Sequence, residues 1–210
     1  MPLYKTITVD DSTNILIWKI EESFEFLSEG IELTDHCRNR VDNMKSDMHR
    51  RGFMSIRHLL AIFGYTDHDL YYDDFGKPHL KDGKQISITH SYEYAGVIIS
   101  DKLVGIDIEK QREKIHRIAH KFVESEQEFV DQQKEDKTRV LTVIWGAKES
   151  LYKLYGTAGL SFEQNIHIMP FDLNMPFTAG SIHHNDKISH YDITFTEFDG
   201  FTCVYALPYV

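Results

Sequence analysis

The sequence predicts an α+β protein built as two halves, and three observations support that class. Of the 210 residues, 41% are hydrophobic, enough for one large domain or two small lobes with packed cores. Strand-like and helix-like segments come in blocks along the chain: strands, helices, strands, then helices and strands again. No low-complexity segment or long linker interrupts these blocks, so we expect two halves that join near residues 100–103 in one compact unit.

The first half is expected to begin with a pair of strands and to continue with helices. β-Branched and aromatic residues flank the turn Asp10-Asp11-Ser12, and another strand pair surrounds Tyr92-Glu93. The predicted strands are 3–9, 14–20, 86–88 and 95–99. Helical spacing of apolar residues predicts helices over 21–27 and 44–63, which end at Gly30 and Gly64. Gly and Pro make residues 73–78 a loop.

The second half is expected to begin with a strand over residues 104–109, followed by helices and then by a run of strands. Apolar periodicity predicts helices over 115–129 and 137–155, with the polar run 131–136 between them. The C-terminal part has the β-branched and aromatic character of strands. Those predicted strands are 166–169, 181–183, 191–198 and 201–206.

Composition and charge exclude several classes of protein. A net charge of −10 argues against broad nucleic-acid binding, which needs a basic surface. No apolar run has the length of a membrane span, and the first ten residues lack the pattern of a signal peptide, so we expect a cytoplasmic protein without a membrane partner. Cys37 and Cys203 have no CxxC or Cys/His spacing, and we interpret both as neutral thiols.

Acidic residues interrupt the otherwise apolar segment 104–109. Alternation along a strand places Asp107 and Glu109 on the same face, with Gly105 clearing space beside them. An Asp-x-Glu pair is often a solvated part of an edge strand. Here the flanking Val and Ile residues indicate burial, and two adjacent carboxylates need a cation or a proton. Oxygen ligands without cysteine favour Mg²⁺, which keeps waters and shares its other positions with phosphates.

A helix through residues 145–155 places Glu149 and Lys153 one turn apart on one side. The simplest interpretation is an ion pair on the helix surface. Because Trp145 and Tyr152 flank Glu149, the carboxylate can instead complete a metal site or serve as a general base, with Lys153 neutralising phosphate charge.

Three further segments carry groups that suit phosphate or nucleotide, each with a simpler alternative. Cations concentrate over residues 38–57, either as a solvated helix face or as a phosphate-binding wall. Thr89 and His90 end a strand with a hydroxyl and an imidazole, although such a histidine is usually structural or exposed. Lys77 and Pro78 belong either to an ordinary turn or to a loop that lines a base and a phosphate.

These motifs resemble the 4'-phosphopantetheinyl transferase superfamily, specifically its larger surfactin-synthetase type with two pseudo-symmetric halves. The resemblance spans residues 75–155 and rests mainly on the last two of the four matching segments. The matching segments are Gly76-Lys77-Pro78-His79-Leu80, Ile88-Thr89-His90-Ser91, Gly105-Ile106-Asp107-Ile108-Glu109 and Trp145-Gly146-Ala147-Lys148-Glu149-Ser150-Leu151-Tyr152-Lys153. The resemblance implies two α/β halves, each a small, mostly antiparallel sheet packed with helices.

The resemblance also implies a site for coenzyme A (CoA) and magnesium. Residues 1–102 would hold the adenine and 3'-phosphate side, and residues 103–210 the metal site and the catalytic helix. The implied metal ligands are Asp107, Glu109 and Glu149. The implied CoA-binding residues are Arg40 and His90 near the 3'-phosphate, Thr89 on the same strand, Lys77 and Pro78 beside adenine, and Lys153 at the pyrophosphate. The chain differs from the usual pattern at Gly52 and Ile56, where an acid and a small residue are common, and at Thr89, which replaces a serine.

The function implied is Mg²⁺-dependent transfer of phosphopantetheine from CoA to a serine of an acyl or peptidyl carrier protein, with release of adenosine 3',5'-bisphosphate. Glu149 is the candidate base and Lys153 stabilises the leaving oxygens. We expect a monomer whose basic residues after the metal strand meet an acidic carrier; these are Lys110, Arg112, Lys114 and Arg117. A metal-dependent phosphodiester hydrolase and a non-catalytic CoA-binding protein remain as alternatives.

Overall fold

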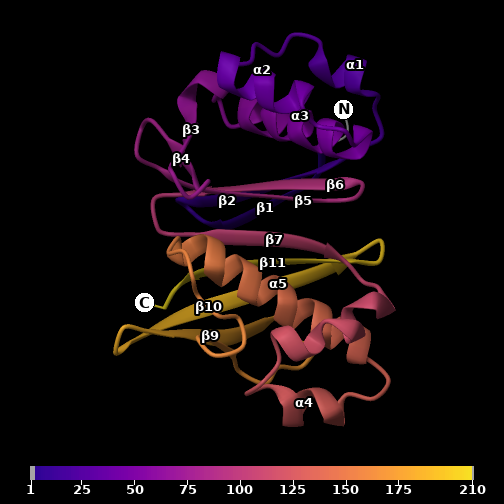
Figure 1. Ribbon diagram of the computed structural model, residues 1–210, viewed down its shortest axis with the longest axis vertical. Coiled ribbons are helices and arrows are strands. Elements are labelled where there is room, and N and C mark those ends of the chain that lie inside the picture. The colour runs from indigo at the N-terminus through magenta and orange to yellow at the C-terminus, as the bar shows by residue number, and fades with distance from the viewer. Residues whose placement is uncertain (1–2, 210) are drawn as a thin grey trace. The chain divides into compact units, whose positions relative to one another are not determined.

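The computed structural model describes residues 3–209, which belong to two compact units (Figure 1). Unit 1 comprises residues 1–102 and unit 2 comprises residues 103–210. Each unit combines an antiparallel sheet with helices, so the predicted α+β class is confirmed.

Unit 1 contains a four-stranded antiparallel sheet in the order β1-β2-β6-β5. Its strands are β1 (Leu3–Asp10), β2 (Thr13–Lys19), β5 (Gln85–Ser91) and β6 (Tyr94–Ser100). Between β2 and β5 the chain forms α1 (Phe24–Ser28), α2 (Asp35–Asp42), α3 (Asp47–Ile62), the 3₁₀ turn η1 (Asp67–Asp69) and the hairpin of β3 (Leu70–Tyr72) and β4 (Pro78–Leu80). The predicted strand pairs around residues 10–12 and 92–93 are therefore present.

Helix α3 covers the sheet of unit 1 and closes its core. The Ser46 hydroxyl caps the helix by accepting a hydrogen bond from the backbone N–H of His49. The buried face of α3 includes Phe53, Met54 and Leu60, which join Trp18 of β2 in a single apolar cluster. Helix α3 packs on β2, β6 and, less extensively, on β5, so it lies next to the strand that carries Thr89 and His90.

Unit 2 contains a five-stranded antiparallel sheet in the order β7-β11-β10-β9-β8. Its strands are β7 (Gly105–Lys110), β8 (Ile166–Ile168), β9 (Phe177–His184), β10 (Lys187–Phe198) and β11 (Phe201–Pro208). Its helical segments are η2 (Glu113–Arg117), η3 (Ala119–Lys121), α4 (Gln127–Gln132) and α5 (Lys137–Tyr155). Helix α5 ends at Gly156, whose positive φ of 69° is the left-handed conformation that glycine adopts without strain.

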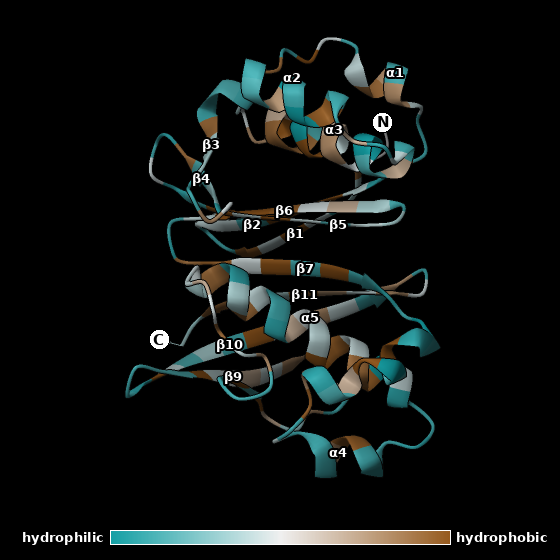
Figure 2. Cartoon of the chain, viewed as in Figure 1, coloured by the Kyte–Doolittle hydropathy of each residue, from teal (hydrophilic) through white to brown (hydrophobic). Residues whose placement is uncertain are grey.

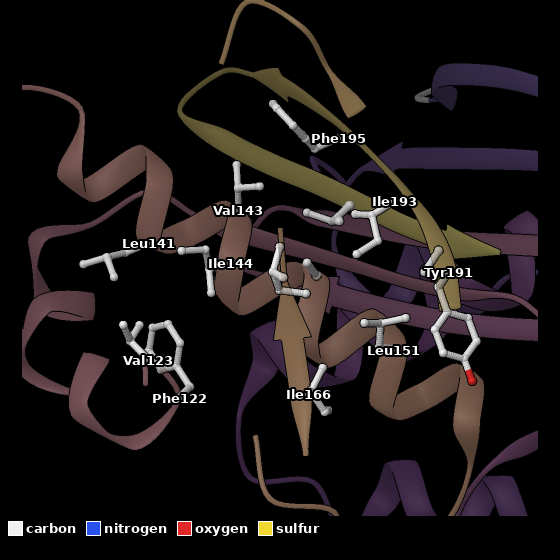
Figure 3. Packing of buried hydrophobic residues seen from close by; sticks show 14 of the residues in the cluster. Phe122, Val123, Leu141, Val143, Ile144, Leu151, Ile166, Tyr191, Ile193 and Phe195 are labelled. Carbon is white, nitrogen blue, oxygen red and sulfur yellow. The ribbon is translucent and has the colours of Figure 1, made fainter. Parts of the chain in front are cut away.

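Helix α5 packs directly on β7 and β11. A Cβ atom at Gly105 would lie 1.9 Å from the backbone oxygen of Ser150, so only glycine lets the strand and the helix approach this closely. The core behind the contact contains Ile144, Leu151, Ile193 and Phe195 (Figure 3). Because the contact is backbone against backbone, the side chains beside it have little freedom to shift.

The predicted helix over residues 115–129 is wrong for most of its length. The chain there forms the 3₁₀ segments η2 and η3, and α4 begins only at Gln127. Neither 3₁₀ segment contains a buried residue, and the buried side chains are those of Phe122 and Val123, which follow η3. The loop at 73–78 is present as the turn of the β3–β4 hairpin, whose strands the sequence did not indicate.

Hydrophilic residues dominate the surface helices α2 and α4, whereas α3 and α5 carry apolar residues toward their sheets (Figure 2). In the part of the chain that the structure describes, no helix combines the length and the apolar character needed to cross a membrane.

Candidate active site

Strand β7 and helix α5 bring the predicted acidic residues of unit 2 to one place. Strand β7 pairs with β11, with Asp107 opposite Val204 and Glu109 opposite Thr202. Asp107 is 5% exposed, which excludes the alternative of a solvated edge residue, and Glu109 is half-buried. The burial predicted for this strand is therefore present.

A stripe of three α5 residues, four positions apart, faces these acids. Trp145 Nε1 donates a hydrogen bond of 3.1 Å to Glu109 Oε1. Two turns later, Lys153 Nζ donates to Asp107 Oδ1 at 2.7 Å and to the carbonyl oxygen of Ile106 at 3.0 Å. Glu149 lies between Trp145 and Lys153 on the same side of the helix. The helix therefore runs antiparallel to β7, with each end of the stripe bonded to the strand.

The charges of Asp107 and Glu109 influence the pKa of the Glu149 carboxyl group. Burial raises this pKa, and the charge of Asp107 raises it further. The Lys153 ammonium opposes the increase, Glu109 adds to it, and the result is about 7. Part of the Glu149 population is therefore protonated at neutral pH. A divalent cation close to these carboxylates would favour the ionised form.

The residues present fit a magnesium ion that keeps part of its water shell. The donors are carboxylate oxygens, and Asp107 Oδ2 is buried beside Gly146 of α5, where a Cβ atom would lie 3.9 Å from it. Within residues 3–209, no three His, Cys, Asp or Glu side chains are close enough to enclose a metal by themselves. Mg²⁺ commonly takes one or two carboxylates and completes its shell with waters and substrate phosphates. That all three carboxylates contact the same ion remains a prediction.

The predicted nucleotide-binding residues of unit 1 lie in two adjoining groups. The Arg40 guanidinium lies 5.1 Å from the Tyr72 ring, and Tyr72 pairs with Pro78 in the β3–β4 hairpin. Arg40, Lys77 and Pro78 are thus gathered at this hairpin, which neighbours β5. Lys77 is half-buried, and burial lowers the pKa of its ammonium.

The second group of unit 1 is formed by β5 and α3. Thr89 is 4% exposed, whereas His90 is exposed, and the His90 ring lies 5.7 Å from that of His49 on α3. His90 is thus held against a helix rather than on an isolated strand end.

Sequence reasoning missed the buried ion pair that anchors the other side of α5. Lys148 Nζ is 2.9 Å from Glu126 Oε1 and donates to the carbonyl oxygen of Phe162 at 2.9 Å; both charged side chains are at most 1% exposed. Glu126 also accepts a hydrogen bond from the backbone N–H of Ile168 in β8. A lysine inside an apolar helix signals such a pair, but the partner, 22 residues away, has no local signal.

Four cations of unit 2 surround a cavity of about 780 Å³ between η2 and the start of α5. Two of them, Lys114 and Arg117, belong to the basic patch expected after the metal strand. The residues that line the cavity are Glu113, Lys114, His116, Arg117, Lys134, Glu135, Lys137 and Thr138. The cations therefore outnumber the acids in this part of an otherwise acidic chain.

Fold and site together define an α+β protein in which one strand carries Asp107 and Glu109 and the helix packed on it carries Glu149 and Lys153. Residues 103–205, which carry this site, match the family model described as 4'-phosphopantetheinyl transferase superfamily. The resemblance to this superfamily that the sequence motifs indicate is therefore confirmed over unit 2, and the larger two-half type remains a prediction.

Comparison with solved structures shows a weaker likeness. The crystal structure of Thermotoga maritima holo-[acyl-carrier-protein] synthase (AcpS) matches at 17% identity and a TM-score of 0.42. The match covers 50% of this chain and 61% of that structure. No curated protein matches the chain. The family assignment therefore rests on the family model and the motifs.

Proposed function

We propose that the chain transfers the 4'-phosphopantetheine group of CoA to a serine hydroxyl of an acyl or peptidyl carrier protein. The observation that carries this proposal is the α5 stripe of Trp145, Glu149 and Lys153 facing Asp107 and Glu109. A half-buried carboxylate with a pKa of about 7, one helical turn from a lysine, suits a reaction that moves a proton and a phosphoryl group. The match of residues 103–205 to the superfamily model supports the same reaction.

In the proposed reaction the serine oxygen bonds to the phosphorus that carries the pantetheine arm. The bond from that phosphorus to the pyrophosphate bridging oxygen breaks, and adenosine 3',5'-bisphosphate leaves with the electron pair. Glu149 accepts the serine proton, because a pKa of about 7 matches a base at neutral pH. Lys153, already hydrogen-bonded to Asp107, stabilises negative charge on the leaving oxygens.

Asp107, Glu109 and Glu149 would hold Mg²⁺, which offsets pyrophosphate charge when bound. Lys153 would remain beside Asp107 in that arrangement. The chain's own contribution is to exclude water at the Asp107 end and to orient Glu109 through the Trp145 indole. The proposed adenosine side is in unit 1, where Lys77 and Pro78 would line the base and Arg40, Thr89 and His90 would lie near phosphate.

The proposed partner is an acidic carrier domain that meets the cations around the unit 2 cavity. The chain carries ten more negative than positive charges, so a carrier of like sign would be repelled by most of its surface. Positive charge is concentrated around the unit 2 cavity, which is lined by Lys114, Arg117, Lys134 and Lys137. Complementary charge at this place would guide association and orient the serine-bearing loop. The proposed enzyme acts as a monomer.

The direct test is incubation of the purified protein with CoA, Mg²⁺ and a panel of apo carrier proteins, followed by mass spectrometry of the carriers. The expected result is the addition of one phosphopantetheine group to a single serine. Consumption of CoA without a carrier would identify a phosphodiester hydrolase instead. Binding of CoA with neither reaction would identify a non-catalytic binding protein.

A pair of glutamate variants tests the assignment of the base. Glu149→Gln keeps the size of the side chain and is expected to lower kcat by roughly 10²- to 10⁴-fold, as loss of a general base does. Glu128→Gln, on the exposed side of α4, is the matched control and should leave kcat unchanged. Full turnover by Glu149→Gln would remove this residue from the mechanism.

A further inference from the structure

Two histidines of unit 2 lie on the face of the sheet that turns away from α5. Strand β8 carries His167 next to Ile166, and β9 carries His183 next to Ile182. Both isoleucines belong to the core cluster that includes Leu151 of α5, and Figure 3 labels Ile166 and Leu151. Since successive side chains of a strand point to opposite faces, both histidines lie on the other face. They are therefore separate from the carboxylates of the candidate active site.

The two imidazole rings are in contact across the strands. Their centroids are 4.5 Å apart with an interplanar angle of 62°. His167 is opposite Ser181 in the register, so His183, two residues beyond Ser181, is its diagonal neighbour. Imidazole nitrogens bind zinc at about 2.0–2.1 Å, and two such rings on one ion have centroids roughly 4.5–5 Å apart. The spacing of the two rings therefore matches that of a two-histidine metal site.

Each ring is oriented by a serine hydroxyl at one of its nitrogens. Ser125 Oγ lies 3.0 Å from Nδ1 of His167, and Ser181 Oγ lies 3.1 Å from Nε2 of His183. In a neutral imidazole, an N–H that donates to the hydroxyl leaves the lone pair on the other nitrogen. Histidines that bind metals usually have such a partner behind the ring, which fixes the tautomer and the orientation. The ligand atoms are then Nε2 of His167 and Nδ1 of His183.

The surroundings of His167 favour its neutral form, which is the form that binds a metal. Burial lowers the pKa of its imidazole below the ordinary 6.5, and the charges of His183 and Lys148 lower it further. The charge of Glu126 and a hydrogen bond with the backbone of Gln164 oppose this decrease without cancelling it. At pH 7 the ring is therefore mostly neutral.

We propose that His167 and His183 together bind a divalent transition-metal ion of the zinc, nickel and copper group. Imidazole nitrogen suits these ions, whereas Mg²⁺ prefers oxygen ligands such as those of the candidate active site. Within residues 3–209, no third His, Cys, Asp or Glu joins the two rings, so water completes the coordination. The ion would tie β8, a strand of only three residues, to β9. This inference is independent of the proposed function.

The test is calorimetric titration of the protein with Zn²⁺ in the presence of excess Mg²⁺, which competes at the carboxylates. The wild type should bind one Zn²⁺ that His167→Gln and His183→Gln each weaken on the order of tenfold or more, since even the loss of an outer partner costs about 10- to 100-fold. The matched control is His184→Gln. This histidine follows His183 but lies on the other face of β9, where its ring contacts Tyr155, and its variant should bind Zn²⁺ as the wild type does.

Electron paramagnetic resonance of the protein with Cu²⁺ identifies the ligand atoms directly. The expected spectrum shows coupling to two imidazole nitrogens, and this coupling should persist in Glu149→Gln and decrease in His183→Gln. Unchanged Zn²⁺ affinity in His183→Gln, or an equal loss in His184→Gln, would overturn the site. Loss of Zn²⁺ binding in Glu149→Gln alone would assign the ion to the carboxylates and overturn it as well. Because neither measurement uses CoA or a carrier protein, failure of the proposed function leaves both results unaffected.

Discussion

Helix α3 in unit 1 and helix α5 in unit 2 each lie across an antiparallel sheet, and each contact contains a glycine next to a functional side chain. In unit 1, Gly52 on the helix makes room for the His90 ring. In unit 2, Gly105 on the strand meets the backbone of Ser150, beside Asp107. In both units, therefore, a glycine permits a close contact between helix and sheet, next to an imidazole in unit 1 and next to a carboxylate in unit 2.

The two contacts differ in what the glycine touches, and this difference sets how rigid each site is. The ring of His90 is an exposed side chain that can rotate away, whereas the oxygen of Ser150 belongs to the backbone of a buried helix. The acids of unit 2 are consequently held at fixed distances from Lys153 and Trp145. A phosphate group can adjust to mobile donors, whereas positioning catalytic groups requires a fixed frame.

Each unit also contains a buried ion pair beside its long helix, and the largest predicted effect concerns these pairs. Lys148→Met would leave the buried Glu126 carboxylate with a hydrogen bond from the backbone N–H of Ile168 but without its lysine, and should cost about 3–5 kcal/mol of stability. Arg57→Met should cost less, because its partner Asp67 keeps two hydrogen bonds from Thr34. Urea unfolding would measure both.

A double variant supplies the control for the ion pair of unit 2. Lys148→Met combined with Glu126→Leu removes both charges and should recover a large part of the stability lost by Lys148→Met alone, because no unpaired charge stays buried. If the double variant is less stable than Lys148→Met, the electrostatic explanation is wrong and the lysine acts through packing.

The carboxylates of the two units should respond to pH in opposite ways. The pKa of Glu149 is raised to about 7 from 4.5, so between these values the folded protein binds more protons than the unfolded chain, and stability falls as pH rises. The pKa of Asp67 is lowered from 3.8, because Arg57 and Thr34 outweigh the effect of burial. Its contribution is present above pH 3.8 and is lost as pH falls below it.

Thermal unfolding in EDTA and in Mg²⁺ would check the prediction for Glu149. In EDTA the Tm should fall by several degrees from about pH 5 to about pH 8, and Mg²⁺ should raise Tm more at the higher pH, where the carboxylate is ionised. Glu149→Gln should flatten both trends, and Glu128→Gln should keep them. An equal effect of Mg²⁺ at both pH values would place the ion away from Glu149.

Alanine at the two glycines tests the difference in rigidity directly. Gly105→Ala forces Cβ against the Ser150 carbonyl, and either strand or helix must move, at a cost of about 1–3 kcal/mol or more. Gly52→Ala gains helix propensity while it displaces one exposed ring, so its stability should lie within about 1 kcal/mol of the wild type. Comparable losses in the two variants would show that both contacts are equally rigid.

Local patterns in the sequence predict how the candidate residues of unit 2 lie on their strand and helix, because these residues follow short periods. Asp107 and Glu109 are two residues apart on a strand, and Glu149 and Lys153 are four apart on a helix; the structure places each pair as that spacing requires. The hydrogen bond from Trp145 to Glu109 could not be predicted, since it depends on the direction in which the helix crosses the strand.

Features that depend on distant contacts were missed. Glu126 lies in a polar segment without any sign that it is buried, and only the folded unit reveals Lys148 as its partner. Residues 115–129 have enough apolar residues for a helix, yet the chain there forms two short 3₁₀ segments, and the burial falls on Phe122 and Val123, which follow them. The proximity of the His49 and His90 rings could not be predicted either, because the two residues belong to different elements, α3 and β5.

The smallest predicted effect concerns the cations of the two units. Lys114 and Arg117 line an open cavity in unit 2, and their replacement by glutamine should lower the rate of carrier modification a few-fold at low salt, through kcat/KM rather than kcat. The difference should shrink as salt screens the charges. Arg38→Gln, an exposed cation of unit 1, is the control and should change neither constant. A loss that persists unchanged at high salt would mean that Lys114 and Arg117 act through shape or hydrogen bonding instead of attracting an acidic carrier.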